Sequence, residues 1–89
     1  MKVILLRHLR IQALGREIDL KLIEDALLNP NQIVSDVKGL KIAQKKYLDG
    51  KKEYLIRVIF REELSKRIGV TVYKTSKIKK YWRQNENKI

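Results

Sequence analysis

Two segments of this chain, residues 53–62 and 68–75, alternate apolar side chains with cationic or hydroxyl ones. A period of two is typical of a strand with one buried face, so we expect two strands of a sheet. Their polar face carries Arg57 and Arg61 beside Tyr73. Guanidinium groups next to an aromatic hydroxyl suit the binding of a phosphodiester. The alternative is that these side chains only solvate an exposed sheet face.

A third strand, expected at residues 41–48, adds Lys41 and Lys45 to the same cationic face. Asp49 and Gly50 follow this strand and predict a type I′ hairpin turn, in which both central positions have positive φ. The three strands together predict a cationic sheet surface.

Histidine is the side chain that ordinarily titrates near neutral pH, which makes His8, the only one here, the natural candidate for a general acid or base. The alternative is a histidine at a helix start that bonds a backbone carbonyl. His8, Gln12 and Arg16 recur every fourth residue, which predicts one face of a helix over 7–14.

Aromatic and cationic residues are interleaved near the C terminus, where we expect Ser76 to cap a short helix over 77–83. Such interleaving suits stacking on unpaired bases while the cations hold phosphates. The alternative is that Ile78 and Trp82 dock this helix on the core while its lysines remain exposed. We expect docking for Trp82. The residues assigned to nucleic-acid contact here are Lys77, Lys79, Lys80 and Tyr81.

The remaining pattern predicts an α+β fold. We expect a first strand at 3–6 and a second helix that begins after Asp19 and ends at Asn29-Pro30. A short strand at 32–37 then leads to a turn at Gly39, and a polar stretch at 63–67 precedes the last strand. This order predicts a four-stranded, mainly antiparallel sheet with an extra N-terminal strand and helices on one face. Residues 1–83 form a single domain, and 84–89 form a polar tail that frays.

Composition narrows the function. The 89 residues carry a net charge of +11, and residues 41–89 hold 15 Lys and Arg against 5 Asp and Glu, a net +10. Such a basic segment indicates a polyanion partner, with nucleic acid first. There is no cysteine and no Gly-rich phosphate loop, so we expect neither a metal nor another cofactor. The apolar start is too short to span a membrane, which favours a soluble cytoplasmic protein with no membrane partner.

Several short motifs occur in an order that resembles a small domain of unknown function grouped with the RelE-like and BrnT-like type II toxins. They are His8-x-x-x-Gln12-x-x-x-Arg16-x-Ile18, Asn29-Pro30, Tyr54 to Phe60 and Thr71 to Ser76, and the resemblance spans residues 3–82. His8 and Arg16 match the usual His-x-x-x-Arg-x-x-x-Arg, and Gln12 departs from it.

The resemblance implies a RelE-like fold and a metal-independent endoribonuclease held inactive by an acidic antitoxin. RNA, free or on the ribosome, is cleaved in this hypothesis by attack of a ribose 2′-hydroxyl. His8 or Tyr73 handles protons, and Arg57, Arg16 and Lys74 stabilise charge on the phosphoryl oxygens. The alternative is a non-catalytic module, or an orphan toxin homologue, that binds nucleic acid or an acidic protein. RNA preference and oligomeric state are left open.

Overall fold

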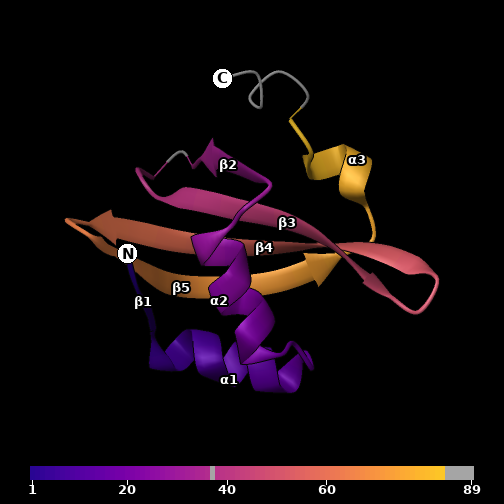
Figure 1. Cartoon of the computed structure of the whole chain (residues 1–89), viewed down its shortest axis with the longest axis horizontal. Coiled ribbons are helices and arrows are strands. Elements are labelled where there is room, and N and C mark those ends of the chain that lie inside the picture. The colour runs from indigo at the N-terminus through magenta and orange to yellow at the C-terminus, as the bar shows by residue number, and fades with distance from the viewer. Residues whose placement is uncertain (37, 84–89) are drawn as a thin grey trace.

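A five-stranded sheet organises the computed structural model, which describes residues 1–36 and 38–83 (Figure 1). The strands are ordered β1-β5-β4-β3-β2 across the sheet. Their bounds are β1 Lys2–Leu5, β2 Gln32–Ser35, β3 Lys41–Asp49, β4 Lys52–Glu63 and β5 Lys66–Thr75. The helices are α1 Arg7–Gly15, α2 Leu20–Leu28 and α3 Ile78–Tyr81. The α+β class is therefore confirmed.

The sheet is mixed, which corrects the expectation of a mainly antiparallel one. Strands β2 to β5 form an antiparallel meander, but β1 pairs with β5 in parallel, from Lys2 opposite Lys66 to Leu5 opposite Gly69. The chain leaves β1 through two helices and enters the sheet again at the opposite edge. A short apolar strand carries no signal of its partner or direction, so its sequence could not indicate this pairing.

Helices α1 and α2 pack on one face of the sheet, which we call the helix face. Asp19 caps α2 as predicted, because its Oδ1 accepts a hydrogen bond of 2.9 Å from the Lys21 amide. The apolar stripes of the two helices then meet the alternating apolar residues of β4. The buried core consists mainly of Leu5, Leu9, Ala13, Ile18, Ile23, Ala26, Leu27, Ala43, Ile56, Val58, Phe60 and Val72.

A β-bulge in β5 changes which residues face the core. Phe60 pairs with Gly69 and Ile59 pairs with Thr71, so Val70 is the extra residue between them. Gly69, not Val70, thus lies on the helix face, where a side chain would meet the Leu9 methyl at 2.8 Å. Strict alternation over residues 68–75 would place Ile68 and Val70 on the face of Val72, but the bulge interrupts that alternation.

The predicted type of the hairpin turn is corrected. Asp49 pairs with Lys52, so Gly50 and Lys51 are the central residues of the hairpin, and only Gly50 of these has positive φ (66°). A glycine at the first central position is typical of a type II′ turn rather than type I′.

Helix α3 is shorter than expected and begins without a side-chain cap. Ser76 makes no capping bond; instead Thr75 Oγ1 accepts a hydrogen bond of 3.0 Å from the amide of Lys77, the residue before the helix. Helix α3 also lies away from α1 and α2 (Figure 1), against the opposite sheet face, which we call the α3 face. Helices therefore cover both faces of the sheet. The predicted frayed tail lies outside the described residues. None of the helices described is long and apolar enough to cross a membrane.

Candidate nucleic-acid interface

Four polar side chains form a continuous row across the α3 face. Gln32 pairs with Gln44, Gln44 with Arg57, and Arg57 with Tyr73. Residues directly opposite in neighbouring antiparallel strands project to the same face, so all four side chains meet there. The bulge makes this possible, because without the extra residue Arg57 would lie opposite Val72.

Arg57 is the centre of this polar row. Its side chain is buried, with 8% of the residue exposed. The guanidinium Nε donates to Gln44 Oε1 at 2.6 Å, and Nη1 donates to the Tyr73 hydroxyl. The ring of Tyr81 lies over the guanidinium, 4.2 Å from its carbon. Every one of these partners is neutral.

No carboxylate pairs with Arg57 among residues 1–36 and 38–83, because the four ion pairs there all involve other cations. A guanidinium remains charged at any accessible pH, so burial does not neutralise it. Burial of a charge without a counter-ion is costly, and neutral hydrogen bonds with a cation–π contact offset only part of that cost. The position thus retains a strong positive potential.

The two glutamines of the row hold α3 in place. Gln44 Nε2 donates to Gln32 Oε1 at 2.7 Å and to the Tyr81 carbonyl at 3.2 Å. Gln32 bonds the backbone of Arg83 twice, accepting from its amide at 3.0 Å and donating to its carbonyl. These bonds satisfy polar groups that would otherwise be buried without partners. They fix Tyr81 above Arg57.

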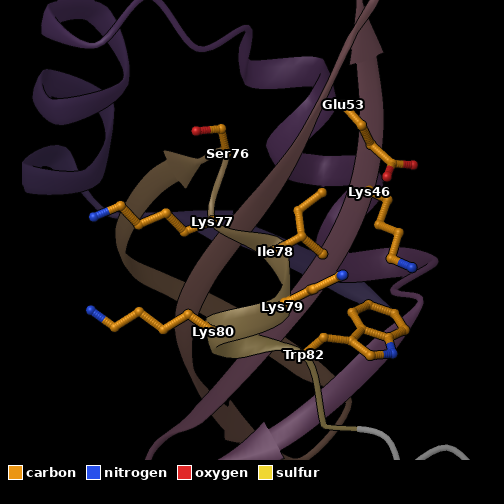
Figure 2. A pocket seen from close by; sticks show the side chains of 8 residues that line it. All are labelled: Lys46, Glu53, Ser76, Lys77, Ile78, Lys79, Lys80 and Trp82. Carbon is orange, nitrogen blue, oxygen red and sulfur yellow. The ribbon is translucent and has the colours of Figure 1, made fainter.

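A hollow of about 830 Å³ lies beside α3 (Figure 2). Ile78 and Trp82 supply its apolar surface, while Lys46 of β3 and Glu53 of β4 border it from the sheet. The Lys46 Nζ lies 4.1 Å from the centre of the Trp82 ring. Lys77, Lys79 and Lys80 also line the hollow and are exposed, as predicted for Lys79 and Lys80. Trp82 is half-buried and borders this hollow; Tyr81 is the residue above the buried row.

Lys41, Lys45 and Lys74 do not belong to the α3 face, which corrects the predicted cationic surface. Lys41 pairs with Phe60, whereas Lys45 and Lys74 pair with Ile56 from its two sides. The side chains of Phe60 and Ile56 lie in the core on the helix face, so the lysines opposite them project to that face too. A two-residue turn pairs odd positions of β3 with even positions of β4, so Lys41 and Lys45 share the face of the core and Lys46 takes the α3 face.

Lys41 and Lys45 of the helix face form ion pairs, as does Arg61, whereas Lys74 lies 5.5 Å from the centre of the Tyr54 ring. Lys45 lies 2.6 Å from Asp25 of α2, and Lys41 lies 2.6 Å from Glu62. Hydrogen bonds from Lys45 and then Asn29 lower the pKa of Asp25, and bonds from Lys41 and then Arg67 lower the pKa of Glu62. Arg61 pairs with Glu63 at 2.7 Å. These charges stabilise the fold or solvate it.

The predicted partners from α1 do not join the polar row. His8 is exposed on α1, which packs on the helix face. Arg16 donates to the Val72 carbonyl at 2.6 Å, and Gln12 accepts from the Val72 amide at 3.1 Å. Both side chains therefore bond the backbone of β5 beyond the end of β1. An arginine at position 12 has no acceptor for this amide, which gives Gln12 a structural role.

Of the five predicted catalytic residues, the structure brings Arg57 and Tyr73 into contact. Sequence reasoning missed Gln32, Gln44, Lys46 and Glu53. Gln44 gave one signal, an uncharged polar residue that directly follows Ile42 and Ala43 in an expected strand. The described residues contain no cluster of three or more His, Asp or Glu side chains that could hold a metal.

Comparisons with family models, with curated proteins and with solved structures give no match to this chain. The chemistry of the α3 face is therefore the basis for a function. It offers a buried cation, a half-buried phenol, an indole and exposed ammonium groups, which together suit a ligand with phosphates and aromatic rings.

Proposed function

We propose that this chain binds single-stranded RNA through its α3 face. The observation that carries the proposal is the buried Arg57, whose bonding partners are all neutral. A phosphate near this position supplies the missing counter-charge in surroundings where water screens it weakly.

The charge of Arg57 reaches a ligand through Tyr73. The Tyr73 hydroxyl accepts from the guanidinium and keeps its own proton to donate. Tyr73 is only half-buried, so a phosphate oxygen can accept that proton at the surface. Lys46, Lys79 and Lys80 extend the positive surface around it, and Trp82 offers a ring on which an unpaired base stacks.

Fluorescence anisotropy with a labelled 12-nucleotide RNA tests this proposal. We expect binding that weakens steeply from 50 to 300 mM KCl, because each neutralised phosphate releases counter-ions. The slope of log affinity against log salt should become shallower by about 1.4 in the double variant Lys79→Gln/Lys80→Gln. Each phosphate contact in a single strand contributes roughly 0.7 to that slope, and this variant removes two. Absence of binding at 50 mM KCl, or binding that does not respond to salt, would contradict the proposal.

A second candidate is RNA cleavage at Tyr73, supported by the Arg57–Tyr73 bond and by the resemblance to RelE-like and BrnT-like toxins. The ribose 2′-oxygen attacks phosphorus and its proton passes to water. The P–O5′ bond breaks, and Tyr73 donates a proton to the departing 5′-oxygen, leaving a 2′,3′-cyclic phosphate and a 5′-hydroxyl. An acidic antitoxin would cover this same face.

Incubation of RNA with the protein and EDTA tests cleavage. We expect cyclic phosphate ends from the native protein and His8→Ala, and intact RNA from Tyr73→Phe. Equal cleavage by Tyr73→Phe, or its loss in His8→Ala, would contradict this assignment, and intact RNA throughout would leave binding alone.

A further inference from the structure

The hollow beside α3 combines an apolar wall with both signs of charge. Lys46, Glu53, Ile78 and Trp82 lie on one side of α3, whereas Lys77 and Lys80 extend to the other (Figure 2). Lys46 lies over the Trp82 ring and fixes the orientation of the indole. A volume of about 830 Å³ falls within the range of pockets that hold small ligands.

Glu53 is the unexpected member of this lining. It is exposed, and its carboxylate makes no ion pair or hydrogen bond with any of the described residues, although four lysines line the same hollow. The carboxylate repels the phosphates that the lysines attract. It therefore acts on a different part of an RNA ligand, one that presents N–H donors.

We propose that the hollow receives one unpaired guanine, which stacks on Trp82 while Glu53 accepts hydrogen bonds from its edge. This inference rests on the proposed RNA binding. Guanine presents two neighbouring donors, N1–H and the N2 amino group, and a carboxylate accepts both at once. Uracil presents one N–H between two carbonyl oxygens, which the carboxylate repels. The base takes the place of Lys46 over the Trp82 ring, and Lys46 and Lys79 then contact the flanking phosphates.

The same carboxylate disfavours an acidic peptide in this position. A peptide that places an apolar side chain against Trp82 brings its own carboxylates close to Glu53. Repulsion between like charges in a confined site discriminates against that partner. Charge complementarity therefore favours a base, which carries donors and no negative charge, with its phosphates outside.

Binding of two nine-nucleotide RNAs tests the inference, one of uridines only and one with a central guanosine. The native protein should bind the guanosine RNA about tenfold more tightly, the value of one good bidentate contact. Glu53→Gln should reduce this preference below about threefold without weakening binding of the uridine RNA. The matched control is Glu63→Gln. Glu63 lies on the same strand but outside the hollow, so this variant should retain the preference.

Trp82→Ala should weaken binding of both RNAs and remove the preference, with circular dichroism to verify that each variant is folded. Salt-dependent binding of the two RNAs with equal affinity would overturn this inference and leave the proposed function standing. Failure to bind the uridine RNA would overturn the proposed function itself. Displacement of RNA by an acidic, leucine-containing peptide from the native protein but not from Trp82→Ala would overturn the guanine inference, because the hollow would then be a peptide site.

Discussion

Lys41 and Lys45 on the helix face differ from Arg57 and Lys46 on the α3 face in how their charges are balanced. On the helix face, Lys45 pairs with Asp25, and Glu62 pairs with both Lys41 and Arg67. On the α3 face, Arg57 and Lys46 have no carboxylate partner among the described residues. The first arrangement stabilises the folded chain. The second leaves positive potential available to a ligand, which is why we assign binding to the α3 face.

Burial follows the same division. The helix face is closed by apolar side chains of two helices, whereas the α3 face is closed by a four-residue helix over polar groups. Paired exposed charges contribute little to stability, and a buried unpaired charge subtracts from it. Variants that separate stability from binding therefore distinguish the two faces.

The largest effect on stability is expected from Leu27→Ala in the core of the helix face. Leu27 is fully buried, so its truncation leaves a cavity and costs about 2–5 kcal/mol. Leu48→Ala is the matched control, because Leu48 is 70% exposed, and it should cost less than about 0.5 kcal/mol. Urea unfolding measures both, and equal losses would contradict the described core.

A different result is expected from Arg57→Met. Removal of the buried charge offsets the lost hydrogen bonds, so the free energy of unfolding should change by about 1 kcal/mol or less. RNA affinity should fall about tenfold, since a hydrogen-bonded charge is lost from the site. Arg61→Met, which removes an exposed cation paired with Glu63, is the control and should leave both quantities nearly unchanged. A loss of several kcal/mol with unchanged affinity would make Arg57 a structural residue.

The smallest effect on the free energy of unfolding is expected from the protonation of Asp25 and Glu62 at low pH. The pKa values of Asp25 and Glu62 lie below their ordinary values because of bonds from Lys45 and Lys41. Because each pKa is lower in the folded state than in the unfolded chain, the two ionised carboxylates stabilise the fold. This contribution is complete above the unfolded-state pKa, about 4, and is lost as pH falls through the folded-state pKa. Both groups are partly exposed, so the loss is modest.

Unfolding at pH 7 and pH 3 measures that loss. The double variant Asp25→Asn/Glu62→Gln should lose less stability between the two pH values than the native protein. An identical loss would show that other carboxylates account for the acid sensitivity.

Local sequence signals predicted most elements of this fold. Asp19 and Asn29 mark the ends of α2, and the alternation around Val58 predicted the core face of β4. These features depend on neighbours in sequence, so periodicity and capping reveal them. The parallel pairing of β1 with β5 depends on distant segments and had no local signal.

The site was only partly predictable for a related reason. Arg57 and Tyr73 were placed together because each alternates with apolar residues, and the structure brings them into contact. The predicted face of Lys45 was wrong because it depends on the register between β3 and β4, which the two-residue turn fixes with Lys45 opposite Ile56. The glutamines were missed because neutral amides carry no charge pattern; their role is visible only from the cross-strand row.

Adjacent lysines on opposite faces provide the most direct test of the central claim, that the α3 face binds RNA. Lys45 lies on the helix face and Lys46 on the α3 face, so Lys45→Gln and Lys46→Gln remove the same charge one residue apart. Affinities for a single-stranded RNA at 100 mM KCl should show Lys46→Gln several-fold weaker than the native protein and Lys45→Gln nearly equal to it. Equal losses in the two variants, or a larger loss in Lys45→Gln, would contradict the assignment.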